Sequence, residues 1–486
     1  MKFNTIDLAV VIIFFLIMIA IGIGSYFRSR SSEDYFVAGG KLPWWLAGIS
    51  HHVSGHSGAV FVAYAAVAYT HGITMYMWWA LPVGAVIIAT AKIFPVYWVR
   101  LRKELRIQSP LEYLSIRYNL LTQQLIAWAG VLLKVFDVGA KWAAIGILLK
   151  VVAGIPMTTG ILVSGVVTLV YVTVGGLWGV IVTDLVQFIV QVLGGIVMFV
   201  LVVSRLGGVD SITGIWKRLP PDHSQLFNDP YTAGFVGVMF FLYFLSYNGG
   251  SWGLATRYIS SPNEKEASKA ARLSGILYLV WPLILFFPMW AAPILLPGLT
   301  RPSESYGLLM VEILPQGMIG LVIASLFAAT MGMTSSDVNT VSAVITRDIL
   351  PVVAGRFRNH SLRTARVTTF VFTLATISIA LNYERFGGVL GLIVNWFAAL
   401  LGPTSMPLIF GLLPAFKSCG PRAAIASILT GLVTFVIAKD RNLDNLALEV
   451  GLPTIMSAII FVVFGLFTKN IPPRVTGLMA ALRKPS

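Results

Sequence analysis

Residues 50–58 read SHHVSGHSG and interrupt an apolar run that extends over residues 44–70. Three of the six histidines of the chain lie in these nine residues, together with two glycines. Glycine allows the backbone to leave helical geometry, and the carbonyl groups that are then released need new partners. A second interruption, SYNGGS at residues 246–251, falls in the apolar run at 233–255. Two polar breaks in long apolar runs predict broken helices that line a binding site, although glycine kinks for close helix packing are the alternative.

The composition is that of an integral membrane protein. The chain has 486 residues, of which 57% are hydrophobic and only 11% are charged, and its mean hydropathy is +0.83. Soluble domains average about 25% charged residues, so a soluble fold would leave large apolar patches exposed. Thirteen apolar stretches approach the length of about 20 residues that spans a bilayer. They are 6–26, 44–70, 75–98, 124–152, 157–174, 178–204, 233–255, 270–296, 318–346, 364–382, 388–414, 422–439 and 452–470.

The formal net charge of +15 indicates a membrane topology and not nucleic-acid binding. Lys and Arg concentrate in alternate connections, beginning with residues 27–43, and are much rarer in the other connections. Because basic residues favour the cytoplasmic side, the N-terminus is predicted outside and the C-terminus in the cytoplasm of a multi-pass cell membrane protein. The expected partners are the lipid bilayer, a small-molecule solute and a coupling cation, with no nucleic acid, and the sequence does not specify the oligomeric state. The single cysteine, Cys419, excludes an internal disulfide.

The spacing of the two breaks predicts an internal repeat. They fall in the second and seventh predicted spans, which suggests that spans 2–6 and 7–11 form two five-helix units. The predicted division is therefore a first helix with a cytoplasmic loop (1–43), a first repeat (44–204), an extracytoplasmic loop (205–232), a second repeat (233–416), and two accessory helices with a cytoplasmic tail (417–486).

Three further motifs carry a family resemblance. They are DYFVAGGKLPWW at 34–45, GGLWGVIVTDLVQ at 175–187 and FAATMGMTSSDVNTVSAVITRDI at 327–349. Over residues 6–415 the chain resembles the sodium-coupled solute symporters, a family that includes glucose, proline and sialic acid symporters. The resemblance implies an all-α membrane protein with the LeuT-like inverted repeat, in which a coupling ion drives solute uptake by alternating access.

The resemblance implies two cation sites, and the first is incomplete in this sequence. Its backbone carbonyls fall on Ser50, Val53 and Ala329, whereas its two hydroxyl ligands fall on Gly332 and Met333. Na+ is a hard cation that prefers oxygen, and a thioether is a poor substitute. The first site would therefore need water or solute oxygens to complete its shell.

The second implied cation site retains its side chains, which are Asp184, Ser335 and Ser336. An acidic residue inside a membrane is usually functional, although Asp184 could instead form a cap or a salt bridge near the cytoplasmic face. Na+ is the expected coupling ion, with H+ on Asp184 or His52 as the alternative. No other cofactor or metal is expected.

The histidines of the first break allow three interpretations. His52 and His56 are four residues apart and would share a face if this segment stayed helical. A zinc site would need further ligands that the neighbouring sequence does not supply. The histidines could instead bond to released carbonyls, or they could recognise the solute or carry a proton.

A charged helix face and nearby aromatic residues bear on the solute. Lys134, Asp137 and Lys141 share one face of the span at 124–152 and leave one surplus positive charge. Asp184 or a solute carboxylate could compensate that charge, and a closed salt-bridge ladder is the alternative. The expected solute is a small polar compound: a sugar, an acidic sugar or an organic acid. The candidate binding residues are Ser54, Ser57, His52, His56, Trp78, Lys141, Asn248, Ser251 and Trp252.

Other classes of function fit the sequence less well. A channel would need a continuous polar stripe, whereas the polarity here is concentrated at two breaks. An enzyme would need a loop with catalytic acids, and a solute sensor would need a signalling domain after the last span. The prediction is a secondary active transporter and not an enzyme, with a proton-coupled or uncoupled transporter of the same fold as the alternative.

Overall fold

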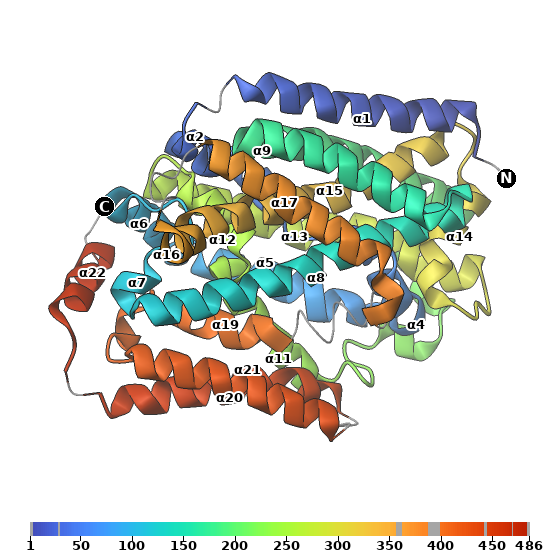
Figure 1. The fold of residues 1–486 in the computed structure, drawn as a ribbon. Helices are drawn as coiled ribbons and strands as arrows, with labels where there is room; N and C mark the ends of the chain where they lie inside the picture. The colour runs from blue at the N-terminus through green and yellow to red at the C-terminus, as the bar shows by residue number, and fades with distance from the viewer. Residues whose placement is uncertain are drawn as a thin grey trace.

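The chain forms one helical bundle. The computed structural model describes residues 3–27, 30–355, 362–386, 399–441, 445–468 and 470–483. Within these ranges the only β feature is an isolated bridge between Asn228 and Tyr231, so the prediction of an all-α protein is confirmed. Figure 1 shows the long helices side by side, with the two ends of the chain at opposite ends of the bundle.

The helices have the following bounds: α1 Thr5–Tyr26, α2 Ser32–Val37, α3 Trp44–Val53, α4 Ala63–His71, α5 Leu81–Thr90, α6 Phe94–Leu105, α7 Leu114–Arg117, α8 Leu120–Ala153, α9 Met157–Arg205, α10 Ser211–Gly214, α11 Ala233–Leu245, α12 Trp252–Ile259, α13 Glu264–Leu295, α14 Ser305–Ile313, α15 Met318–Val344, α16 Leu350–Val353, α17 Leu362–Leu381, α19 Ala399–Phe410, α20 Pro421–Asp440, α21 Leu446–Leu466 and α22 Pro473–Arg483. Three π-helical segments join some of them: η3 Tyr76–Ala80, η6 Ser246–Gly250 and η8 Ile345–Ile349.

The predicted count of thirteen spans is not confirmed. Among the described residues, eight helices are long and apolar enough to cross a membrane, or nine if the pair Tyr76–Thr90 and Phe94–Leu105, bent by 53°, forms one span. Two predicted spans, 157–174 and 178–204, lie in the 49-residue segment α9, which is kinked at Gly176 (φ 56°, ψ −152°), so that two helical parts meet between the two predicted spans. The predicted span at 388–414 lies partly outside the described residues.

Both predicted breaks are present. The first separates α3 from α4, because α3 ends at Val53 and a short turn at Gly58–Phe61 follows before α4 begins. In the second, α11 passes into η6, where Gly249 has a φ of 127° that a residue with a Cβ adopts only with strain. The boundaries of the two repeats, 44–204 and 233–416, stay predictions.

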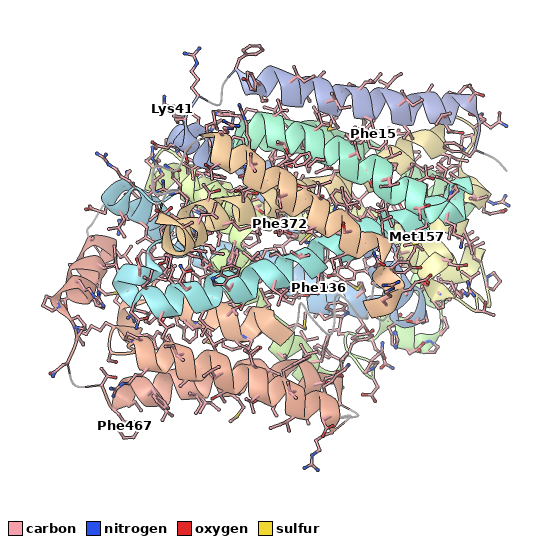
Figure 2. The ribbon with its side chains drawn as sticks, viewed as in Figure 1. Phe15, Lys41, Phe136, Met157, Phe372 and Phe467 are labelled. Atoms are coloured by element: carbon pink, nitrogen blue, oxygen red, sulfur yellow. The ribbon has the colours of Figure 1, made fainter. Side chains whose placement is uncertain are left out.

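The outer helices leave apolar side chains exposed. In Figure 1, α1 lies along α9 at one edge of the bundle, and α20 and α21 form a pair at the opposite edge. Phe467, at the end of α21, is 80% exposed (Figure 2). Side chains such as Ile13 and Val436 are also more than half exposed. An apolar exterior of this kind suits contact with lipid.

Candidate functional site

The two breaks contact each other directly. The Tyr247 hydroxyl of η6 donates to the Gly55 carbonyl of the first break, at 2.8 Å. The Tyr278 hydroxyl of α13 donates to the His52 carbonyl, at 2.9 Å. Carbonyl groups near the break in α3–α4 are therefore held by tyrosines from two other elements. This contact brings two broken segments that are 192 residues apart in the sequence to one location in the bundle.

Asn248 attaches the second break to the neighbouring helices. Its side-chain oxygen accepts from Thr90 Oγ1 at 2.7 Å, and its amide nitrogen donates to the Phe244 carbonyl at 2.8 Å. The Asn248 carbonyl also accepts from Trp98 Nε1, at 2.8 Å. The polar groups of Asn248 are therefore occupied within the protein. Sequence reasoning assigned this residue to the solute, and that assignment stays a prediction.

The histidines of the first break are buried in different surroundings. His51 Nδ1 contacts Ser274 Oγ at 2.8 Å. His56 lies between the His52 carbonyl and Gln191 Oε1, each at 3.1 Å from one ring nitrogen. Both ring nitrogens of His52 lack a hydrogen-bond partner, although its ring packs on Tyr278 with centroids 4.5 Å apart. In the described part of the chain no three His, Cys, Asp or Glu side chains form a metal-binding group, so the structure lends the zinc interpretation no support.

Arg257, which falls between the predicted spans 233–255 and 270–296, lies inside the bundle. Arg257 of α12 is fully buried, and its Nη2 lies 3.1 Å from Asp184 Oδ2 of α9. Its Nε donates to Ser50 Oγ at 2.9 Å, and its Nη1 donates to Ser336 Oγ at 2.7 Å. Ser50 in turn donates to Asp184 Oδ2, at 2.5 Å. The guanidinium group therefore supplies a positive charge at the second predicted cation site.

Two buried side-chain oxygens near α15 lack a hydrogen-bond donor. Asp184 Oδ1 and Gln187 Oε1 are both buried and have no hydrogen-bond partner. The Gln187 amide nitrogen points to Met18 Sδ at 3.6 Å, and the nearby Tyr171 hydroxyl donates to the Met331 carbonyl. A methyl group placed on Gly332 would lie 2.9 Å from Gln187 Oε1 and 3.5 Å from Asp184 Oδ1. Two free oxygens thus lie beside the helix face of α15 where the first predicted site lacks its hydroxyls.

The charged face of α8 is neutralised by α15. Lys134 Nζ lies 3.0 Å from Asp137 Oδ2 and 2.9 Å from Asp337 Oδ1. Lys141 Nζ lies 2.8 Å from Asp137 Oδ2 and 2.8 Å from Asp337 Oδ2. The four side chains are at most 6% exposed, and we call them the charge ring. The surplus charge predicted on α8 is therefore balanced by Asp337 of α15, and neither Asp184 nor a solute is needed for this.

Aromatic side chains from five elements gather around the breaks. Tyr64 of α4 packs on Trp78 and Trp79, with centroids 5.3 and 5.1 Å apart. Trp79 also lies 5.8 Å from Tyr278, and Tyr247 lies 5.4 Å from Tyr278. We call this group the aromatic cluster; its members are Tyr64, Trp78, Trp79, Tyr243, Tyr247 and Tyr278.

The predicted site residues fall into three groups. Ser50, Asp184 and Ser336 come together around Arg257. Ser54, Ser57, His52, His56, Trp78, Asn248, Ser251 and Trp252 lie in or beside the two breaks, where Ser251 contacts Ser246 at 2.7 Å and Trp252 packs against Gly130. Lys141 lies in the charge ring, and Ser335 donates to the Gly332 carbonyl of its own helix.

Sequence reasoning missed Arg257 and Gln187. Arg257 lies at the end of an apolar segment, in the stretch GLATRYIS, where the sequence fits an exposed loop as well as a buried helix. The only signal for Gln187 was its position one turn after Asp184 on the same helix.

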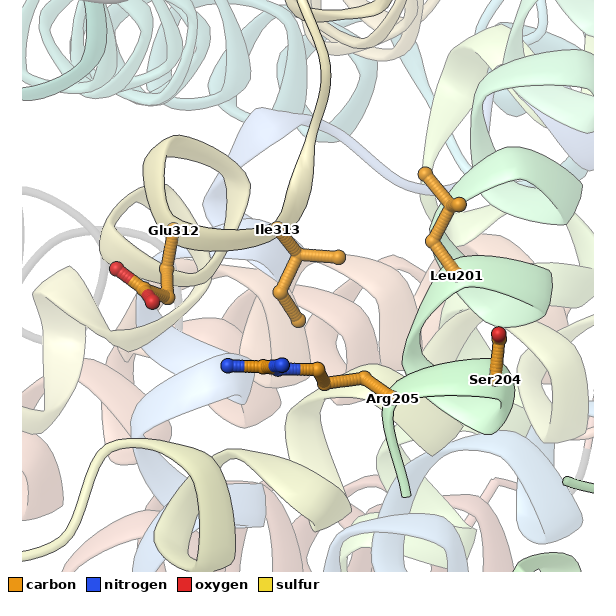
Figure 3. A pocket seen from close by; sticks show the side chains of 5 residues that line it. All are labelled: Leu201, Ser204, Arg205, Glu312 and Ile313. Atoms are coloured by element: carbon orange, nitrogen blue, oxygen red, sulfur yellow. The ribbon is translucent and has the colours of Figure 1, made fainter. Parts of the chain in front are cut away.

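A separate cavity lies away from the breaks. It has a volume of about 550 Å³ and is lined by Leu201, Ser204 and Arg205 at the end of α9 and by Glu312 and Ile313 at the end of α14 (Figure 3). None of its lining residues belongs to the aromatic cluster or to the breaks. It is therefore not the predicted solute site.

A family profile and individual relatives both identify the chain as similar to sodium-coupled symporters. The profile of the sodium:solute symporter family matches residues 35–431. The sodium/sialic acid symporter NanT of Aliivibrio fischeri is 27% identical over 80% of this chain and 81% of its own length. The sodium/glucose cotransporter of Vibrio parahaemolyticus is 26% identical over 71% of this chain and 68% of its own length.

Solved structures agree at the level of the fold. A Na+-coupled sialic acid symporter, solved in a substrate-bound outward-open state, superposes with a TM-score of 0.83 at 20% identity, over 96% of this chain and 99% of its own. A nucleobase-cation-symport-1 family transporter superposes with a TM-score of 0.57 at 13% identity, over 92% of this chain and 98% of its own. The fold is thus that of the LeuT-like symporters. The chain belongs to the sodium:solute symporter family and is an ion-coupled, secondary active solute transporter of a membrane, not an enzyme.

Proposed function

We propose that this transporter imports a small polar solute, of the sugar or acidic sugar class, into the cell together with Na+. The solute binds where the α3–α4 break meets the α11–α12 break. The observation that carries this placement is the hydrogen bond from Tyr247 in one break to the Gly55 carbonyl in the other. Similarity to relatives named for sialic acid and glucose supports the solute class.

Na+ binds at Asp184 Oδ1 and Gln187 Oε1 in this proposal. Arg257 already occupies Asp184 Oδ2 and Ser336, so the second predicted site is left with one free carboxylate oxygen. A buried, unpartnered carboxylate oxygen beside an unpartnered amide oxygen is unfavourable unless a cation or a donor joins them. The carbonyls of Ser50, Val53 and Ala329, on the facing helices α3 and α15, are the further oxygen ligands that we assign to this ion.

The transporter lies in a cell membrane with its N-terminus outside and its C-terminus in the cytoplasm. The alternation of basic connections supports this orientation. Arg257 no longer counts as a connection charge, because it is buried against Asp184. Without Arg257, Lys and Arg are still more frequent in the connections that are predicted on the cytoplasmic side. The positions of the two termini at opposite ends of the bundle fit an odd number of spans (Figure 1).

Uptake into liposomes tests the ion and its position. The purified protein would be given labelled solutes under a Na+ gradient alone and under a pH gradient alone. We expect accumulation only with Na+, and we expect Gln187→Leu to raise the Na+ concentration for half-maximal uptake by about tenfold, because one buried oxygen ligand is lost. Thr183→Val is the matched control on α9, since Thr183 bonds only to carbonyls of its own helix. Accumulation driven by the pH gradient alone would contradict Na+ coupling.

A further inference from the structure

The cavity between α9 and α14 combines two opposite charges with hydroxyl and apolar groups. Its volume of about 550 Å³ lies in the range of about 300–1,000 Å³ that is usual for small-molecule sites. Ser204 and Arg205 end α9, and Glu312 lies in the last turn of α14. Figure 3 shows the Arg205 side chain extended from α9 toward α14, where the Glu312 carboxylate lies. The cavity therefore offers both a cation and an anion to a ligand.

The guanidinium group of Arg205 is available to an anion at the membrane surface. The arginines that form ion pairs in the described ranges are others, namely Arg100, Arg257, Arg301 and Arg347. Arg205, Ser204 and Glu312 are all exposed, so a ligand can reach them from outside the bundle. The helix α9 is long and apolar enough to cross a membrane, and it ends at Arg205. An arginine at the end of such a helix lies at the depth of the lipid headgroups.

An apolar stripe on α9 leads to this cavity. Ile189, Leu193, Ile196 and Val200 are each between 42% and 54% exposed. They follow one another at intervals of three or four residues along one helix face, and Ser204 continues the same spacing. At a rise of 1.5 Å per residue, the distance from Leu193 to Ser204 is about 16 Å. This is about half of the roughly 30 Å hydrocarbon thickness of a bilayer, so the stripe matches the acyl chains of one leaflet.

The polar groups of the cavity match the two charges of a zwitterionic headgroup. A guanidinium group binds a phosphate through two parallel N–H bonds, and the Ser204 hydroxyl can donate a further one. The Glu312 carboxylate can accept N–H bonds from a primary ammonium group. Its two oxygens together offer about four acceptor positions, so an ammonium group can bind there beside a donor from the protein.

We infer that this cavity binds the headgroup of phosphatidylethanolamine from the adjacent leaflet. Arg205 and Ser204 hold the phosphate, Glu312 accepts from the ethanolammonium group, and the acyl chains lie along the apolar stripe of α9. Phosphatidylcholine has no N–H donor for Glu312, and phosphatidylglycerol has no cation at all. The lipid site is separate from the proposed solute and ion sites and does not depend on them.

Native mass spectrometry of the delipidated, purified transporter tests this inference without a transport assay. The probes are phosphatidylethanolamine, phosphatidylcholine and phosphatidylglycerol with identical acyl chains. We expect phosphatidylethanolamine to bind at least about fivefold more tightly than the other two lipids. Phosphoethanolamine without acyl chains should compete only at concentrations at least about 100-fold higher, because it has no apolar surface to place on the stripe.

Three variants connect the lipid to the cavity. Arg205→Gln should weaken the binding of phosphatidylethanolamine by about tenfold, because a charge-assisted contact with the phosphate is lost. Glu312→Gln should remove the preference for phosphatidylethanolamine over phosphatidylcholine. Arg218→Gln is the matched control, because Arg218 is exposed in the connection that follows α9 but does not line the cavity. It should bind the lipid as the native protein does.

The outcomes decide between this lipid and other ligands. Equal binding of the three lipids, or a preference for phosphatidylglycerol, would overturn the inference. It would also be overturned if phosphoethanolamine competed at concentrations equal to those of the lipid. Native affinity in Arg205→Gln and Glu312→Gln, with the melting temperature of both proteins unchanged, would place the lipid elsewhere and equally overturn it.

Discussion

At the scale of single residues, the pairing of Arg257 with Asp184 changes how the ion site is understood. The arginine contacts α3 through Ser50, α9 through Asp184 and α15 through Ser336. Three helices are therefore joined by one buried guanidinium. A buried ion pair contributes little net stability compared with an apolar pair, but removal of one partner leaves an uncompensated charge.

The first prediction is that, in Na+-free buffer, Arg257→Gln destabilises the protein by about 3–5 kcal/mol, because Asp184 is left buried without a cation. The double variant Arg257→Met with Asp184→Asn should recover most of that stability, since it removes both charges. Thermal unfolding of the detergent-solubilised protein measures both effects. The double variant should still fail to accumulate solute, since the proposed Na+ ligand Asp184 is lost. Full uptake by the double variant would show that neither charge takes part in transport.

Gly332 allows α15 to approach α3 closely. A methyl group at this position would lie 2.4 Å from Val53 Cγ1, a contact that requires the Val53 side chain or one of the helices to shift. Restoring the missing hydroxyl of the first predicted cation site therefore conflicts with the packing in this structure.

The second prediction follows from this contact. Gly332→Ser should destabilise the protein by about 1–3 kcal/mol through overpacking, and Val53→Ala should relieve the strain because it removes the contacting methyl group. The triple variant Val53→Ala, Gly332→Ser and Met333→Ser keeps the backbone carbonyl of residue 53 and adds two hydroxyls. It should bind Na+ more tightly than the native protein, as measured by the Na+ dependence of uptake. A weaker Na+ response in a folded triple variant would contradict the placement of the first site.

At the scale of helices, the charge ring joins α8 to α15. Each lysine contacts both aspartates, so the ring has no net charge and every member has two partners. Charges inside a membrane protein are tolerable when they compensate one another in this way. The ring explains why three charges can occupy one face of a buried helix.

The third prediction distinguishes a structural ring from a solute site. Lys141→Gln should destabilise the protein by about 3 kcal/mol, because an aspartate loses a cation, whereas Lys141→Met combined with Asp337→Leu removes a neutral pair and should restore the melting temperature. The double variant should also retain uptake of neutral solutes. Lys150→Gln, at an exposed position of the same helix, is the control and should change neither property. A double variant that folds but loses uptake of every solute would indicate that Lys141 acts in transport.

At the scale of the whole molecule, the two broken helices meet inside one bundle whose outer surface is apolar. The hydrogen bond between Tyr247 and Gly55 joins segments that belong to the two predicted repeats. Alternating access requires that such segments separate from the surrounding helices on one side at a time. The orientation of the bundle in the membrane determines which of these two openings faces the outside and admits the solute for uptake.

The fourth prediction concerns that orientation. In a Cys419→Ser background, which removes the single native cysteine, Asp210→Cys should react with a membrane-impermeant maleimide in intact cells. Lys103→Cys should react only after the membrane is permeabilised. Both positions are exposed, and they lie in connections predicted on opposite sides of the membrane. The reverse labelling pattern would place the N-terminus in the cytoplasm.

Local patterns in the sequence were sufficient for several features of this protein. Its composition predicts a membrane protein, the glycines with polar neighbours predict both breaks, and the spacing of Lys134, Asp137 and Lys141 predicts a shared helix face. Each of these depends on residues that are near one another in the chain. The number of spans stays a prediction, although the kink at Gly176 within α9 falls between two of the predicted spans.

The partners of the buried charges depend on distances between helices, which no local pattern contains. Arg257 and Asp184 are separated by 73 residues, and Lys141 and Asp337 by 196. Asp184 was expected to hold a free cation, and Lys141 was open to a solute, because the sequence alone leaves each charge with several possible partners. Burial in a medium of low polarity forces each charge to find a counter-charge, and the packing of α8, α9, α12 and α15 determines which one is within reach.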